Sequence, residues 1–266
     1  MSGQRALFAA PAATKAARNG RAGAVELVLA HGAYLRLAGD WLLVSEPSVP
    51  LGPLSIAVDG LGQLELAPGL PAAVRDQRLL IGDGALSLER MRTRRMLPLS
   101  SRAPASAAAI ANAAAAALVA LPSVPMVLER GLAALHGGAV LEAVGLLAGL
   151  GPGLTPAGDD VLAGYAASRM MLRGARSRLG PALDDPVPLS TLAAERSSAL
   201  GLAYLRCAER GEVAEPAARL LHAIHTGSAS SARVAAGQLR AWGASSGTAI
   251  ARGILAATLP ISCRVN

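Results

Sequence analysis

Aromatic residues are almost missing from this chain of 266 residues, in which one Phe, two Trp and three Tyr make up 2% of the sequence. Alanine, leucine and valine must therefore build the core, and elements with such small side chains are expected to pack closely. Nucleic-acid binding is not expected, because it favours a basic face with interleaved aromatic side chains. The net charge of +7 comes mainly from scattered arginines. The dense group at residues 90–95 has methionine between its arginines and predicts a solvated or interface-forming strand.

Cysteine and lysine are scarce as well. Two cysteines, Cys207 and Cys263, are too few for a disulfide framework in a chain of this length, which favours a reducing cytosol. Lys15 is the only lysine, so a lysine Schiff base or a phosphate-binding lysine is not expected elsewhere. The first 22 residues contain basic side chains but no continuous apolar block, which argues against a secretory signal. We therefore predict a cytoplasmic protein.

An apolar run at residues 103–121 is roughly long enough to span a bilayer. Most of its residues are alanines, which partition weakly into a membrane, and Asn112 lies midway along it. The run therefore predicts a buried, alanine-rich helix, and no membrane partner is expected.

The chain changes its pattern near residue 100. Between residues 24 and 99, short apolar runs alternate with turn signals such as Asp59-Gly60, which predicts a small antiparallel sheet or barrel. Beyond residue 103 the apolar spacing is helical. We expect an α+β protein with a candidate disordered tail at 1–22, a β-rich domain at 23–100 and an Ala-rich helical domain at 101–266. The expected strands are 25–30, 33–37, 41–45, 54–58 and 85–88, and the expected helices are 105–120, 126–135, 156–173, 189–210, 216–225, 229–241 and 248–257.

One stretch gathers glycines, a hydroxyl and paired carboxylates within a few residues. Residues 149–164 read Gly-Leu-Gly-Pro-Gly-Leu-Thr-Pro-Ala-Gly-Asp-Asp-Val-Leu-Ala-Gly. Its first glycines and prolines exclude a continuous helix or central strand, so the backbone there must turn with unpaired N–H groups. Thr155 followed by Pro156 is typical of a helix N-terminus. A glycine-rich loop that leads into a helix N-terminus is suited to bind a phosphate or a carboxylate.

Asp159 and Asp160 follow this loop directly, and their charges would repel a bare phosphate at short range. Mg²⁺ would offset the repulsion, and so would a ligand that carries N–H donors, such as a carbamoyl or amide group. In the structural alternative, the carboxylates complement the helix dipole and the glycines form a tight turn. No residue is predicted to hold a resident metal. The candidate catalytic residues are Thr155, Asp159 and Asp160, and the candidate ligand-binding residues of the loop are Gly151, Gly153 and Gly158.

Asp160 is the more informative of the two carboxylates. On a helix that begins near Pro156 it shares a face with Ala163, Gly164 and Ala167. These residues are small, so this face is expected to press against a neighbouring element. A carboxylate on such a face must be paired or used on a ligand, because an unpaired buried charge is costly.

A second segment repeats part of the pattern. Residues 157–164 and 246–253 each contain a glycine, a β-branched residue three positions on, and another glycine three positions beyond. Two loop-to-helix turns would then face one site, and Ser245, Ser246 and Gly247 become further candidate ligand-binding residues. Close packing between the two helices explains the glycines equally well.

The run at residues 149–164 resembles the signature of a bacterial family, long known as a domain of unknown function, that includes AllH, a subunit of an oxamate carbamoyltransferase of allantoin breakdown. The resemblance extends more weakly over residues 34–59 and over a C-terminal element. In that family this element tends to read Gly-His-Thr-Ser-Gly with an Asp two positions later, where this chain has Ala244, Ser245 and Ala249.

The resemblance implies a carbamoyltransferase, or a subunit of one, that uses oxamate or oxalurate with carbamoyl phosphate and assembles with other subunits. The alternative is a non-catalytic subunit that binds an anion or another chain, which suits the departures at Ala244 and Ala249. A purely structural protein is a third alternative. Formation of a homo-oligomer is compatible with each of these.

Overall fold

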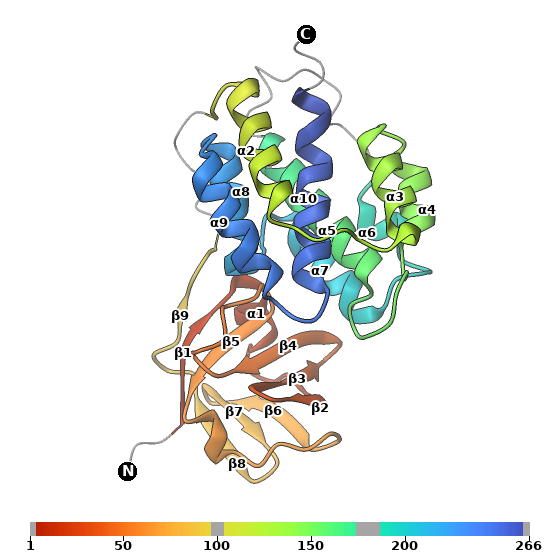
Figure 1. Cartoon of the computed structure of the whole chain (residues 1–266). Coiled ribbons are helices and arrows are strands. Elements are labelled where there is room, and N and C mark those ends of the chain that lie inside the picture. The colour runs from red at the N-terminus through yellow and green to blue at the C-terminus, as the bar shows by residue number, and fades with distance from the viewer. Residues whose placement is uncertain (1–3, 97–103, 174–186, 263–266) are drawn as a thin grey trace. The chain divides into compact units, whose positions relative to one another are not determined.

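The computed structural model describes residues 4–96, 104–173 and 187–262. The chain divides into two compact units, residues 1–96 and 97–266. The first unit consists mainly of strands and the second of helices (Figure 1). The predicted α+β class is therefore confirmed, while the boundary expected at residue 100 lies outside the described residues.

The strands form one sheet in the order β5-β4-β3-β2-β6-β7-β8-β1-β9, and a further pairing of β5 with β1 closes it into a barrel. The tight turns at Ala38-Gly39 and Asp76-Gln77 have positive φ at both residues, as two-residue hairpin turns of type I′ require. The strands are β1 (Arg5–Ala9), β2 (Ala22–Leu29), β3 (Gly32–Leu37), β4 (Asp40–Ser45), β5 (Ser55–Asp59), β6 (Pro71–Arg75), β7 (Arg78–Ile81), β8 (Gly84–Ser87) and β9 (Arg92–Thr93).

Strands β2, β3, β4, β5 and β8 were expected from the sequence, and β9 lies in the arginine group at residues 90–95 that predicts a strand. Strands β1, β6 and β7 were not expected. Strand β1 and helix α1 (Pro11–Ala16) lie in the candidate disordered tail, so that expectation is wrong for these residues. The reason is that β1 pairs with both β5 and β8 and thereby closes the barrel. Ala6 and Ala9 of β1 are buried in its core. A short 3-10 helix, η1 (Leu61–Gln63), follows β5.

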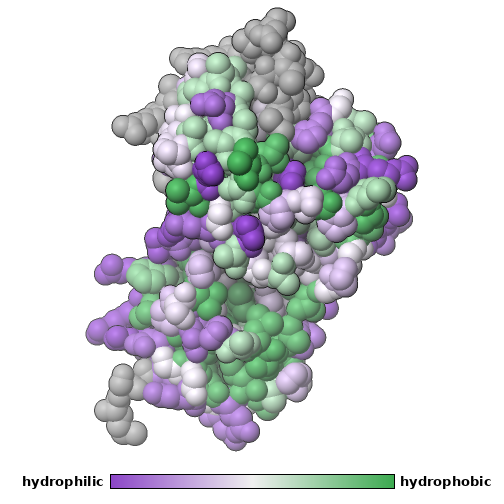
Figure 2. Space-filling view, in the orientation of Figure 1, coloured by the Kyte–Doolittle hydropathy of each residue, from purple (hydrophilic) through white to green (hydrophobic). Residues whose placement is uncertain are grey.

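Aliphatic side chains fill the barrel, as the shortage of aromatic residues predicts; Leu35, Ile56 and Leu79 are completely buried. The arginines of the group at residues 90–95 are exposed, and Arg92 belongs to β9, which pairs with β1 at the edge of the sheet. On the face that Figure 2 shows, hydrophilic side chains are scattered among apolar ones.

In the helical unit, α10 packs against α5, α2, α3 and α9 and runs through the middle of the unit (Figure 1). The expected helices are present, except that the one predicted at 189–210 is divided into α6 and α7, and α4 was not expected. The division occurs because Ser198 caps α7, accepting a hydrogen bond from the Gly201 N–H at 2.9 Å. The helices are α2 (Ala107–Val119), α3 (Met126–His136), α4 (Val140–Leu147), α5 (Ala157–Arg173), α6 (Leu189–Leu192), α7 (Ala199–Glu209), α8 (Glu215–His225), α9 (Ala229–Arg240) and α10 (Ser246–Ser262).

The apolar run at residues 103–121 forms α2, whose Ala113, Ala114 and Ala117 are buried, as predicted. Within the described ranges, no helix combines the length and the apolar character that crossing a membrane requires.

Candidate functional site

The glycine-rich loop joins α4 to α5 and adopts a conformation that glycine alone adopts easily. Gly149, Gly151 and Gly153 have φ values of 72°, 111° and 99°. A side chain at Gly151 would come within 3.1 Å of the Ala157 nitrogen, so the loop folds back over the start of α5. No atom outside the local backbone lies within 4 Å of the place where a Gly153 Cβ would stand. A substitution at Gly153 is therefore opposed by its φ angle and not by contact.

Most backbone N–H groups of this loop have no partner in the part of the chain that the structure describes. Two close the loop: the N–H of Leu150 donates to Leu147 O, and the N–H of Gly158 donates to Leu150 O, both at 2.9 Å. Between them, five N–H groups donate no hydrogen bond to a described residue. They belong to Gly151, Gly153, Leu154, Thr155 and Ala157. Together with the positive end of the α5 dipole, these donors are suited to hold an oxyanion, and we call them the first cradle.

Asp159 is buried and fully engaged within the fold. Its Oδ1 accepts hydrogen bonds from the Gly149 N–H at 2.8 Å and the Ser197 hydroxyl at 2.7 Å. Its Oδ2 accepts from the Ser198 N–H at 3.2 Å. The Ser198 hydroxyl also donates to Leu154 O at 2.6 Å. Asp159 thus holds the loop to the start of α7, and its oxygens already have donors.

Asp160 is in the opposite situation. It is 5% exposed, and its Oδ2 has no hydrogen-bond partner among the described residues. Burial raises the pKa of Asp160 to about 7; the Ser246 hydroxyl opposes the rise, the Asp159 charge adds to it, and the Thr155 hydroxyl opposes it again. The prediction that Asp160 lies on a closely packed face is confirmed. A buried carboxyl oxygen without a donor is costly unless a ligand or a proton satisfies it.

The second candidate element, Ser245-Ser246-Gly247, lies at the start of α10. Ser246 is brought to the Asp160 carboxyl, where Thr155 also interacts. Gly247 and Gly158 are used differently from the prediction, because their N–H groups donate to Trp242 O and Leu150 O within the fold. A side chain at either glycine would meet a backbone carbonyl oxygen at 1.8 Å. These two glycines therefore permit close packing, while Thr155, Asp160 and Ser246 form the centre of the candidate site.

The weak sequence repeat belongs to a complete structural repeat. Helices α3, α4 and α5 begin at residues 126, 140 and 157, and helices α8, α9 and α10 begin at 215, 229 and 246, so the offset is 89 residues each time. The turns inside the two helix pairs also correspond: Gly138 and Gly227 have φ values of 78° and 69°. The helical unit thus contains two copies of a helix-helix-loop-helix segment, and α5 corresponds to α10.

The two copies meet where α5 crosses α10. A Cβ on Gly164 would lie 2.1 Å from Ile250 O, and a Cβ on Gly253 would lie 2.0 Å from Val161 O. Under the 89-residue offset, Gly164 corresponds to Gly253 and Val161 to Ile250. The two contacts are therefore equivalent, as a local two-fold relation requires. The packing interpretation of the repeated glycines is therefore correct. The same helix crossing brings the Ser246 hydroxyl to the Asp160 carboxyl.

The described residues contain no group of three His, Cys, Asp or Glu side chains that could hold a metal ion. At the loop, the oxygens of Asp159 are occupied, so Oδ2 of Asp160 is the carboxyl oxygen left to contact a cation. One carboxyl oxygen does not hold Mg²⁺ by itself, so an ion there would need oxygens of a ligand and water as well.

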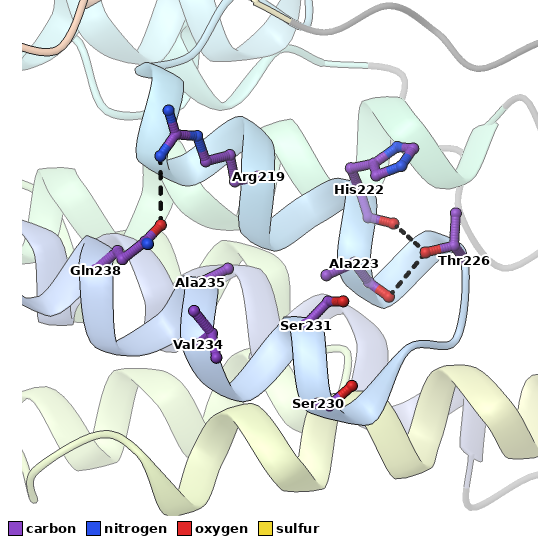
Figure 3. A pocket seen from close by; sticks show the side chains of 9 residues that line it. All are labelled: Arg219, His222, Ala223, Thr226, Ser230, Ser231, Val234, Ala235 and Gln238. Atoms are coloured by element: carbon purple, nitrogen blue, oxygen red, sulfur yellow. Dashed lines mark hydrogen bonds between the residues drawn. The ribbon is translucent and has the colours of Figure 1, made fainter.

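A groove with a volume of about 470 Å³ lies apart from the loop, between α8 and α9 (Figure 3). Arg219 lines it and donates hydrogen bonds to Gln238 at 3.4 Å and to Glu215 at 2.9 Å. His222 also lines the groove, whereas His225 is buried. No residue of the glycine-rich loop contributes to this groove.

The loop and α5 and most of α10 lie within a segment that has a known family pattern. Residues 147–258 match the family model of oxamate carbamoyltransferase subunit AllH. The resemblance predicted from the loop is thereby confirmed. No match was found among curated proteins or among solved structures.

The AllH match contains the whole candidate site. Within it, Ala249 is the counterpart of Asp160 under the 89-residue offset, and Ala244 is the counterpart of Thr155. The chain therefore has a carboxyl group and a threonine in the first copy where the second copy has two alanines. The sequence did not indicate that Ser197 and Ser198 bind Asp159, because they lie 38 and 39 positions after it in the chain.

Proposed function

We propose that the protein is a carbamoyltransferase, or a subunit of one, that binds a small phosphate- or carboxylate-bearing ligand at the loop of residues 149–160. The observation that supports this most directly is the buried Asp160 Oδ2, which has no hydrogen-bond partner among the described residues, in a carboxyl that interacts with Thr155 of the loop. Oxamate and carbamoyl phosphate both carry an anionic end and an amide end, so they offer an acceptor to the N–H groups and a donor to the carboxyl. The AllH match over residues 147–258 supports the same class of ligand.

Each residue then has a stated role. The N–H groups from Gly151 to Ala157 bind the oxyanion, and Asp160 accepts an N–H bond from the amide end. The hydroxyls of Thr155 and Ser246 orient Asp160, while Asp159 positions the loop from inside the fold. A side chain with a pKa of about 7 is also suited to take up a proton near neutral pH.

The reaction follows from this arrangement. The amide nitrogen of oxamate forms a bond to the carbamoyl carbon of carbamoyl phosphate. The bond between that carbon and the bridging oxygen breaks, and phosphate leaves with the electron pair. The proton of the attacking nitrogen passes to the ionised Asp160 carboxylate.

A non-catalytic subunit is the second candidate, and the absence of a carboxyl group at Ala249 favours it. In that case the chain binds the anion, and the partner subunits supply the remaining groups. Under either proposal the protein works in the cytoplasm, which the scarcity of cysteine and the buried, free Cys207 support. Self-association is compatible with both proposals.

The activity test is phosphate-dependent cleavage of oxalurate, measured with the chain alone and then together with the proteins encoded beside it. Activity of the chain alone supports a complete enzyme, whereas activity only in the mixture supports a subunit. Loss of that activity in Asp160→Asn, with folding retained, is expected in both cases. If the mixture is inactive in every combination, the carbamoyltransferase proposal fails.

The binding test uses calorimetric titration of phosphate, carbamoyl phosphate and oxamate, with and without Mg²⁺. Asp160→Asn is expected to weaken oxamate and to spare or tighten bare phosphate, because a repelling charge is removed. Gly153→Val is expected to abolish the binding of phosphate and carbamoyl phosphate, because no β-branched residue adopts a φ of 99° without strain. Identical binding by the parent protein and both variants would make the loop a structural turn.

A further inference from the structure

A second set of unpaired backbone donors lies at the start of α10. The N–H of Gly247 donates to Trp242 O. No described residue accepts a hydrogen bond from the N–H groups of residues 243–246. Gly243 provides the turn with a φ of 64°. These residues are the counterparts of residues 154–157 under the 89-residue offset, so the internal repeat supplies a cradle at each copy.

The two cradles differ in charge. The first turn of α5 contains Asp159 and Asp160, whereas the first turn of α10 contains no acidic residue. The positive end of the α10 dipole is therefore not compensated by a side chain of its own helix. An anion at this end meets less repulsion from the same helix than an anion at the start of α5.

The Asp160 carboxyl connects the two cradles. It interacts with Thr155 of the first and with Ser246 of the second. Its Oδ2 has no hydrogen-bond partner among the described residues, while 95% of the residue's surface is buried. This unpaired oxygen is the observation that points to a ligand, since a helix N-terminus alone does not establish a site.

We propose that the site holds two anions at the same time, one in each cradle, with their hydrogen-bond-donating ends meeting at Asp160. This inference rests on the proposed function and states which cradle binds which anionic group. The five donors and the glycines of the first cradle receive a phosphate group, which offers several acceptor oxygens. The four N–H donors and the Ser245 hydroxyl of the second cradle receive a carboxylate, while the Ser246 hydroxyl stays on Asp160. Two ligands with an anionic end and an amide end would then bring their amide ends together.

Two charge-insertion variants separate the cradles. Leu154→Asp places a carboxylate at the first cradle, and the Leu154 side chain is 45% exposed. Ser245→Asp places one at the second cradle, where Asp retains the helix-capping ability of serine. Met126→Asp is the matched control, because it changes the net charge equally at a residue that is 83% exposed at the start of α3.

The measurement is calorimetric titration of oxamate in the absence and presence of saturating phosphate, at constant ionic strength. We expect simultaneous binding, with the dissociation constant of oxamate changed less than three-fold by phosphate. Leu154→Asp should weaken phosphate at least ten-fold and spare oxamate. Ser245→Asp should do the reverse, while Met126→Asp should leave both unchanged.

Competition between phosphate and oxamate for one place would overturn the two-cradle inference and leave the proposed function intact. Loss of both ligands in Leu154→Asp with unchanged binding in Ser245→Asp would have the same meaning. If neither ligand binds the parent protein, the two-cradle inference and the binding role of the loop fail together.

Discussion

Asp159 and Asp160 are neighbours in the sequence but lie in different environments. A helix rotates by about 100° per residue, so adjacent side chains point to different neighbours. Asp159 meets Gly149, Ser197 and Ser198, which supply three donors. Asp160 meets Ser246 at the start of α10, and its Oδ2 has no partner in the part of the chain that the structure describes. The first side chain therefore stabilises the loop, and the second is the one that we propose to contact a ligand.

Asp159→Ala is expected to lower the free energy of unfolding by about 3 kcal/mol, because it removes a charged acceptor and leaves buried donors unpaired. Urea unfolding followed by circular dichroism measures this change. Asp160→Asn is the matched control and should destabilise the protein less at pH 7. A loss below about 1 kcal/mol in Asp159→Ala would show that the loop is held by other contacts.

The stability of the parent protein should depend on pH through Asp160. The pKa of its carboxyl rises from 3.8 to about 7 on folding. Near pH 7 the unfolded chain has released this proton while the folded chain still binds it in part, so stability falls as the pH rises from 4 to 7. The contribution amounts to roughly 4 kcal/mol.

Asp160→Asn should remove this part of the pH dependence, so the difference in stability between variant and parent should change most between pH 4 and pH 7 and level off above it. Urea unfolding at a series of pH values, in buffers without phosphate, provides the measurement. Parallel curves for the two proteins would mean that Asp160 titrates with an ordinary pKa.

At the scale of elements, the crossing of α5 and α10 determines the site. Gly164 and Gly253 each lie against a backbone carbonyl of the other helix. A backbone cannot move away as a flexible side chain can, so a methyl group there must separate the helices. Separation would also carry Ser246 away from Asp160.

Gly253→Ala is expected to cost about 3 kcal/mol or more, because the added carbon would lie 2.0 Å from Val161 O. Gly164→Ala should cost a similar amount, because its added carbon would lie 2.1 Å from Ile250 O in the equivalent contact. Gly237→Ala in α9 is the control: its added carbon has no neighbour within 4 Å, and alanine favours a helix by about 1 kcal/mol. Thermal unfolding of the three variants measures the difference. Equal melting temperatures for Gly253→Ala and Gly237→Ala would exclude the close crossing.

The sequence predicted the elements whose patterns are local. The helices at α3, α8 and α9 and the strands β3 and β4 were found within two residues of their ends, because apolar spacing and turn residues mark them. Strand β1 was missed, since its partners β5 and β8 lie about fifty and eighty residues away. The burial of Asp160 could be predicted from the small residues on its helix face. The hydrogen bonds from Ser197 and Ser198 to Asp159 could not, because they depend on tertiary packing.

At the scale of the whole molecule, the AllH match covers residues 147–258, which lie within the helical unit. All candidate site residues lie in that unit too, and the barrel contributes none of them. If the chain is a subunit, the barrel, where Arg90 and Arg92 are exposed, is a candidate surface for contact with other chains. The proposed chemistry, however, depends on one carboxyl group in the helical unit.

The most direct test of this account is carbon-13 NMR of the aspartate carboxyl groups, with the Asp160 resonance assigned by its loss in Asp160→Asn. We predict that this resonance titrates with a pKa of about 7. Sulfate, an oxyanion that does not titrate in this range, should raise that pKa, and oxamate should shift the same resonance. An Asp160 carboxyl that titrates near 4 and responds to neither anion would contradict the assignment of this loop as the ligand site.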